Sequence, residues 1–146
     1  MTIQLTTLQV QSRAEHELID LTERVEQLVA DSGVQNGLVY VMTMHTTSGI
    51  VVNENQICLE QDIVNYLARL APVHHGDAGY YHNRYLDSDG RLGVNAGAHL
   101  QSLLGGYFAY FPIAGGKIVR GGRQHVYFAE YDGPLMREVT VQILGD

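Results

Sequence analysis

Hydrophobic positions in the first quarter of the chain predict a strand followed by a helix. Residues 3–10 alternate in polarity and are rich in Thr and Val, as in a half-buried strand. Apolar residues then recur at helical spacing over 13–30, and Ser12 with Glu15 matches a capping box at the start of this segment. We therefore expect a first strand and an amphipathic helix over 13–30 that ends near Gly33.

The middle of the chain predicts two more strands and a second helix. A continuous apolar run at 38–42 indicates a strand buried on both faces, and residues 50–52 indicate a shorter strand. Helical spacing returns over 59–70 and is ended by Pro72. Residues 73–92 are polar and predict a long loop, which in a compact domain is either functional or mobile.

Strand patterns dominate the last third. Asn95 is a favourable N-cap for a short helix that continues to about Leu104. Segments separated by glycine-containing turns follow, and they predict strands at 107–113, 118–120, 124–131 and 136–144. The whole pattern predicts one α+β domain over residues 1–146, with largely antiparallel sheets and about three helices.

Charge and cysteine content narrow the classes of partner. The net charge is −7 and Lys117 is the single lysine, so we expect neither nucleic acid nor a membrane surface as partner. Local donors can still bind an anionic small molecule. Cys58 is the only cysteine, which excludes an internal disulfide. Because no apolar run approaches the ~18 residues of a membrane span and the N-terminus lacks a signal-peptide pattern, we expect a cytoplasmic protein.

Histidines are the main chemical signal of this sequence. Imidazole binds transition metals and transfers protons near neutral pH. The chain has seven histidines, of which five fall between residues 45 and 99: His45, His74, His75, His82 and His99. With nearby carboxylates and amides, two or more of them could form a site of the two-histidine, one-carboxylate kind.

His45 follows the strand predicted at 38–42, so its side chain emerges at the end of a rigid element. The hydroxyls of Thr46, Thr47 and Ser48 come next and can donate to an anion or hold the imidazole in one tautomer. The alternative is a histidine that only bonds a backbone carbonyl at the end of its strand.

His99 lies four residues after Asn95, so both side chains project from one face of the predicted helix. An N-cap at Asn95 places free backbone N–H groups nearby, which suits an anion. The alternative is packing of His99 into a core with neighbouring leucines. His82 is a further candidate because it is flanked by Tyr80 and Tyr81.

Two other segments carry weaker signals. Glu54 follows a predicted strand and could supply a carboxylate to a metal or accept a proton, or could serve a turn that leads into the next helix. Residues 121–124, Gly-Gly-Arg-Gln, could hold a phosphate between backbone N–H groups and Arg123, or could form a tight turn or β-bulge. We expect solvent-exposed or structural roles for His16, His74 and His125, and keep His75 in reserve.

Together, several motifs resemble those of the YjbQ-like family, often labelled secondary thiamine-phosphate synthase enzyme. They occur in the family's order and lie at 45–50, 53–55, 81–82, Asn95, 98–100, 103–105 and 130–134. The resemblance implies an α+β sandwich that assembles as a homotrimer. It also implies a polar histidine pocket for a phosphorylated small molecule, with a divalent metal ion, Zn or Mg.

The resemblance assigns roles to particular residues. It implies His45, Glu54, His82 and His99 as catalytic residues, and the three histidines among them as metal ligands. From the residues themselves, we expect Thr47, Ser48, Asn95, Arg123 and Gln124 to bind substrate. The chain departs from the family at Arg123, where the family usually has Trp, and at Leu135, where it usually has Arg.

The predicted function is therefore a thiamine-phosphate synthase-like transferase, which joins a pyrimidine pyrophosphate to a thiazole phosphate. This activity could be weak or secondary. Two alternatives stay open: a non-catalytic trimer that binds a small molecule or metal, and a metal-dependent hydrolase of phosphate esters.

Overall fold

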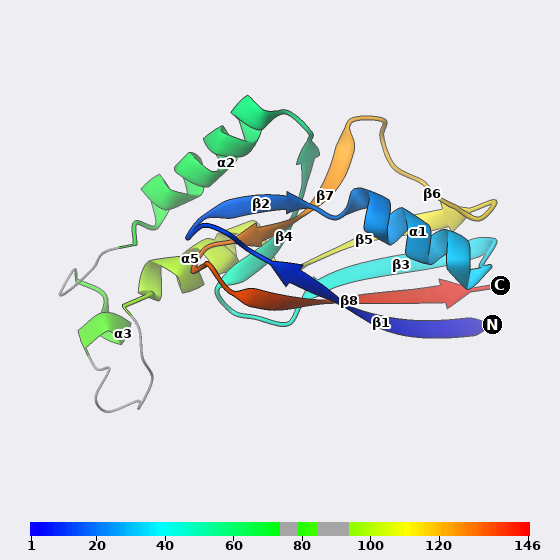
Figure 1. Cartoon of the computed structure of the whole chain (residues 1–146), viewed down its shortest axis with the longest axis horizontal. Coiled ribbons are helices and arrows are strands. Elements are labelled where there is room, and N and C mark those ends of the chain that lie inside the picture. The colour runs from blue at the N-terminus through cyan, green and yellow to red at the C-terminus, as the bar shows by residue number, and fades with distance from the viewer. Residues whose placement is uncertain (74–78, 85–93) are drawn as a thin grey trace.

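The computed structural model describes residues 1–73, 79–84 and 94–146, and two antiparallel sheets form its body (Figure 1). The five-stranded sheet has the order β1 (Thr2–Gln11), β8 (Met136–Gly145), β3 (Asn36–Thr43), β5 (Phe108–Ala114) and β6 (Lys117–Ile118). The three-stranded sheet has the order β2 (Glu17–Asp20), β7 (Gln124–Glu130) and β4 (Ser48–Glu54).

Helices complete the fold at two places. Within the described residues these are α1 (Thr22–Ser32), α2 (Ile57–Leu70), α3 (Tyr81–Arg84) and α5 (Ala96–Gly105). Figure 1 shows α1 near the chain termini and the other three at the opposite end of the molecule. The predicted α+β class with antiparallel sheets is thus confirmed. None of the described helices has the length and apolar character needed to cross a membrane.

The main hydrophobic core lies between the two sheets, and α1 closes it. It buries Val39 and Val41 of β3, Phe128 of β7, and Val25 and Val29 of α1. Full burial of each such side chain contributes about 1.5–3 kcal/mol. Val25 and Val29 are four residues apart, so the amphipathic pattern of the sequence places them on one face of the helix.

A second, smaller core joins α2 and α5 to the other face of the three-stranded sheet. It contains Leu67 of α2, Ala98 of α5, and Ala129 with the adjoining Tyr131. Because side chains alternate along a strand, β7 directs Phe128 to the main core and Ala129 to the helices. This strand is therefore buried on both faces.

The prediction that the strand at 38–42 is buried on both faces is wrong within this chain. Val39 and Val41 are buried in the main core, but Leu38, Tyr40 and Met42 on the opposite face of β3 are only half-buried. No described helix packs on that side, because α1 packs on the main core and α2 and α5 on the three-stranded sheet.

The helix predicted over 13–30 is the main error at the level of secondary structure. Residues 17–20 instead form β2, which pairs with β7, and the helix begins only at Thr22. The predicted capping box is not used, because Ser12 donates its hydroxyl to Glu130 and not to a helix backbone. The predicted end is confirmed: Gly33 adopts a left-handed conformation with φ of 72°.

The middle helices agree more closely with the sequence. α2 begins two residues before the predicted 59 and ends at the predicted Leu70. Asn95 occupies the N-cap position of α5, but its side chain makes no capping bond, and Asn83 accepts from the first helical N–H instead. The segment predicted as a loop contains α3; its turn at 87–90 lies outside the described residues.

A buried ion pair connects the two sheets. Glu130 ends β7 of the smaller sheet and Arg137 is the second residue of β8 in the larger one. Arg137 Nε donates to Glu130 Oε2 at 2.8 Å. The side chains are 0% and 6% exposed. Ser12 also donates to Glu130, and Arg137 donates to Thr47 Oγ1 at 3.0 Å. Since nearly every polar atom of the pair has a partner, its burial is compensated.

Breaking this pair should destabilise the protein far more than breaking a surface pair. We expect Arg137→Met to lower the free energy of unfolding by about 3–5 kcal/mol, because it leaves the Glu130 carboxylate buried without its cation. Arg120→Met removes a more exposed pair with Glu26 and should cost about 1 kcal/mol or less. Urea denaturation of both variants measures the difference; equal losses would contradict the assigned role.

Candidate functional site

Two of the three predicted site histidines meet at the helical end of the molecule. His82 lies on α3 and His99 on α5, and their ring centroids are 5.1 Å apart in a T-shaped arrangement. Both side chains are half-buried. The sequence separation of these histidines gave no indication of this contact, which arises because α3 packs near the start of α5 through Asn83.

Asn95 connects His82 to a carboxylate. The Asn95 amide nitrogen donates to Asp132 Oδ2 at 2.8 Å, so the Asn95 oxygen is left to accept from His82 Nε2 at 3.0 Å. His82 must therefore carry a proton on Nε2 in this arrangement. The chain His82–Asn95–Asp132 fixes the ring orientation and tautomer of His82, as a carboxylate does in catalytic histidine sites.

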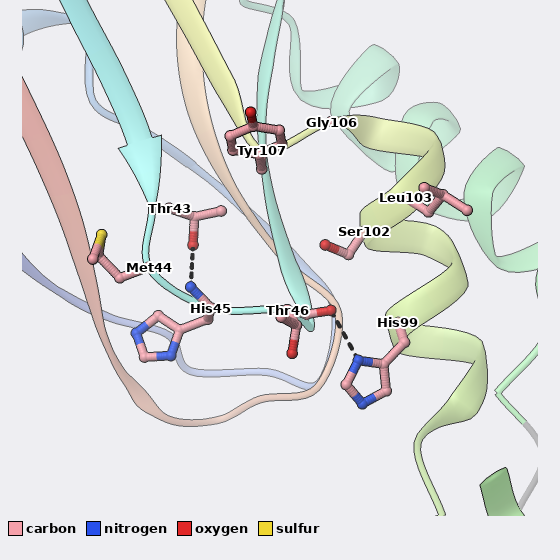
Figure 2. A pocket seen from close by; sticks show the side chains of 9 residues that line it. All are labelled: Thr43, Met44, His45, Thr46, His99, Ser102, Leu103, Gly106 and Tyr107. Atoms are coloured by element: carbon pink, nitrogen blue, oxygen red, sulfur yellow. Dashed lines mark hydrogen bonds between the residues drawn. The ribbon is translucent and has the colours of Figure 1, made fainter.

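His99 is held by the loop between β3 and β4. Its Nδ1 donates to the backbone oxygen of Thr46 at 3.1 Å, so in the neutral ring the lone pair is on Nε2 (Figure 2). The helix that carries His99 packs tightly because its neighbours are small. A Cβ on Gly97 would lie 2.5 Å from the Pro72 backbone oxygen, so only glycine fits there.

His45 does not join the other two histidines. Its ring points toward β8 and away from His99 (Figure 2), and its Nε2 accepts the Glu138 backbone N–H at 3.0 Å. The ring is therefore protonated on Nδ1 when neutral. Burial and the nearby Arg137 guanidinium lower the pKa of His45 below its ordinary value.

The hydroxyls of Thr47 and Ser48 are buried and bonded within the protein. Thr47 accepts from Arg137, and the Ser48 hydroxyl lies 2.6 Å from that of Thr43. These two predicted substrate-binding residues hold the β3–β4 loop in shape. In the described structure their hydroxyls bond to other protein groups and so position the loop that lines the cavity.

Glu54, Arg123 and Gln124 lie at the other end of the three-stranded sheet. Glu54 ends the seven-residue strand that Ser48 begins, which places the two about 20 Å apart at ~3.3 Å per residue. Glu54 pairs with Arg123 at 3.0 Å, and Gln124 accepts the N–H of Gly121 to close a turn. Within one chain, these three predicted residues therefore lie far from His82 and His99. Residues 121–124 form a turn, which was the alternative to a phosphate site.

An open cavity of about 560 Å³ lies between the β3–β4 loop and α5. Its lining, drawn in Figure 2, has apolar side chains on one part and imidazole and hydroxyl groups on another. The lining residues are Thr43, Met44, His45, Thr46, His99, Ser102, Leu103, Gly106 and Tyr107. His45 and His99 thus reach the same cavity from different sides.

Sequence reasoning missed several members of this region. Asp132 is not among the residues predicted for the site, although the motif at 130–134 contains it. Ser102 lies on α5 and donates to the Ser48 backbone oxygen, and Tyr107 immediately precedes β5. The sequence around these two residues has no motif that marks them as site residues. Only their positions in the fold bring them to the cavity.

A metal site is not assembled by the described residues. No group of three His, Cys, Asp or Glu side chains in 1–73, 79–84 and 94–146 is arranged to hold a metal ion. His82 and His99 supply two imidazoles, whereas a catalytic zinc usually has three protein ligands. The reserve candidate His75, with His74, lies outside the described residues.

Comparison with known proteins gives consistent matches over nearly the whole chain. The family model described as UPF0047 protein YjbQ-like matches residues 6–146. A UPF0047 protein from Archaeoglobus fulgidus is 40% identical over 128 residues, covering 88% of this chain and 91% of its own. A YbjQ-like protein of unknown function from Sulfolobus solfataricus P2 has a similar structure, with a TM-score of 0.89, 33% identity and 99% coverage of both chains. A hypothetical protein from Aeropyrum pernix K1 has a TM-score of 0.88 at 31% identity, covering 98% and 99%.

The environment of His45 predicts a measurable pH effect. Its pKa in the folded protein lies below the ordinary histidine value of 6.5, so the unfolded chain binds more protons between the two pKa values. The free energy of unfolding should therefore fall as the pH drops through 6.5 toward the folded pKa. Histidine titration by NMR should give a His45 midpoint below 6.5.

His45→Asn keeps an acceptor for the Glu138 N–H but cannot titrate, so it serves as the control. This variant should lose part of the pH dependence of stability. A His45 midpoint at or above 6.5 would contradict the structural interpretation.

Proposed function

The chain belongs to the YjbQ-like UPF0047 family, and on that premise we propose that it is a transferase of the thiamine-phosphate synthase kind. The substrate would be a phosphorylated small molecule bound in the cavity beside His99. The observation that carries this proposal is the oriented pair of His82 and His99 next to that cavity. Titratable groups placed in this way are characteristic of sites that transfer protons.

The lining of the cavity suits a molecule with both a ring and a phosphate. Its volume of about 560 Å³ falls within the range of small-molecule sites. Met44, Leu103 and Tyr107 offer an apolar surface to a heterocycle. Thr46 and His99 supply polar groups that can meet phosphate oxygens.

In the proposed reaction the pyrimidine methylene carbon loses pyrophosphate and bonds the thiazole nitrogen. Negative charge develops on the oxygen that leaves, and donors placed there lower the barrier. With Nδ1 bound to the Thr46 carbonyl, the His99 ring is held at the cavity, where it would donate a proton to the leaving pyrophosphate. His82, oriented through Asn95 by Asp132, would support this proton transfer.

A divalent ion, Zn or Mg, would neutralise pyrophosphate if bound, and His82 and His99 are the described residues that would contact it. The two imidazoles alone do not make a complete site. We therefore assign no step of the reaction to a metal.

A binding function without catalysis is the second candidate. It is favoured by the internal bonding of Thr47, Ser48 and His45, which leaves few polar groups for chemistry at the cavity. We also propose that the chain acts as a cytoplasmic homotrimer, as the family resemblance implies.

The transferase proposal predicts formation of thiamine phosphate from the two substrates with Mg²⁺. His99→Ala should lower the rate by about 10²- to 10⁴-fold, because it removes the proton-transfer group. His125→Ala is the matched control. His125 lies on β7 opposite Asn53, far from the cavity, and pairs with Asp20 at 2.7 Å. Its rate should stay near that of the unchanged protein.

Chromatographic detection of thiamine phosphate decides between the candidates. No product above the His99→Ala background would refute the transferase. Binding of the thiazole phosphate measured by calorimetry, with no product, would instead support the second candidate.

Metal binding can be tested without an activity assay. Zn²⁺ bound by the protein purified without a tag should be lost in His82→Ala and His99→Ala. It should be kept in His45→Ala, because the Nε2 of His45 is occupied by the Glu138 N–H. Loss of zinc in His45→Ala alone would show that the ligands differ from those proposed.

A further inference from the structure

A second groove lies on the helical side of the three-stranded sheet, between α2, β4 and the C-terminal end of α5. Its volume is about 430 Å³, which is within the range of small-molecule sites. We call it the α2 groove. It shares no lining residue with the cavity beside His99, although α5 contributes to both. The proposed transferase reaction therefore makes no use of it.

The floor of the α2 groove is apolar. Leu67 belongs to the second core, Val51 of β4 and Ile63 of α2 pack against that core, and all three residues line the groove. Leu104 of α5 adds an apolar wall and is 54% exposed. A ligand that covers these side chains removes apolar surface from water, so an apolar body is favoured there.

The face of α2 that forms the groove carries one carboxylate among apolar and aromatic residues. The residues that line the groove recur at the spacing of one helix face: Leu59, Asp62, Ile63, Tyr66 and Leu67. Among the described residues of the lining, Asp62 is the only charged one. Neither Arg69, two turns farther along α2, nor any other described residue pairs with its carboxylate. Asp62 is therefore available to a ligand.

An aromatic ring lies next to this carboxylate. Tyr66 follows Asp62 by four residues on α2, so the two side chains are neighbours on one face of the helix. Tyr66 is 55% exposed and lines the groove. A cation paired with Asp62 can therefore also contact the negative face of the Tyr66 ring. The net charge of −7 favours cations over anions at the same place.

We propose that the α2 groove binds a small organic cation with an aromatic or apolar body. The body lies over Val51, Ile63 and Leu67, and the positive group lies beside Asp62 and Tyr66. Apolar contact supplies most of the affinity, and the carboxylate and the ring select the sign of the charge. A neutral ligand of the same shape keeps the apolar contacts and loses the pairing with Asp62.

Phenethylammonium and its neutral counterpart phenylethyl alcohol test this proposal, because they share one aromatic body and only the first is charged. In an NMR titration of the isotope-labelled protein, phenethylammonium should shift the backbone amides of Val51, Ile63 and Leu104. We expect a dissociation constant of about 1 mM or below. Phenylethyl alcohol should bind about five- to tenfold more weakly, because it forms neither the ion pair nor the cation–π contact.

Asp62→Asn removes the charge and keeps the shape of the groove. It should weaken phenethylammonium about fivefold and leave the affinity for phenylethyl alcohol unchanged. Asp31→Asn is the matched control, because it removes the same charge from an exposed position on α1, outside the groove. It should change neither affinity. Tyr66→Leu should weaken phenethylammonium about threefold, whereas Tyr66→Phe keeps the ring and should retain binding.

The substituted side chains are all exposed, so each variant should stay folded, which circular dichroism checks. Equal affinity for the two ligands, or an unchanged affinity in Asp62→Asn, would overturn the proposal. So would the absence of shifts, shifts confined to the cavity beside His99, or equal losses in Asp62→Asn and Asp31→Asn. The thiamine phosphate assay is a separate measurement, so its failure would leave this result unaffected.

Discussion

The rest of the structure depends on the buried ion pair between Glu130 and Arg137. It joins the end of β7 to the start of β8, and these two strands belong to different sheets. Glu130 also accepts the backbone N–H groups of Tyr131 and Asp132, while Arg137 bonds Thr47. Moving either charge would therefore disturb the turn that carries Asp132 and the loop that carries His45.

Much of the fold could be predicted from the spacing of hydrophobic residues along the sequence and from the residues typical of turns. The strands of the C-terminal half were found because alternating segments are separated by glycine-rich turns, and α2 because Pro72 limits it. The segment at 17–20 was missed because its apolar residues fit helical spacing as part of a longer run. Its pairing with β7 is a long-range interaction, and local pattern carries no information about it.

The site shows the same division. His82, His99 and Asn95 could be named from the sequence, because they are polar residues near element ends and match family motifs. Their mutual contacts depend on how α3, α5 and the β3–β4 loop pack, so spacing could not show that His45 turns toward β8. Glu54 was grouped with the histidines by its motif, yet it lies at the far end of β4. Because a strand is extended, residues only six positions apart, such as Ser48 and Glu54, lie at opposite ends of the sheet.

Burial of β7 on both faces has a consequence for the behaviour of the site. Phe128 belongs to the core between the sheets and Ala129 to the core under α2 and α5, so one strand contributes to both. The helix that carries His99 cannot separate from the protein without exposing the second of these cores. Amide hydrogen exchange in α5 should therefore be slow and should respond to damage in the main core, because the two cores open together. His99 is therefore carried by a helix that belongs to the cooperative part of the molecule.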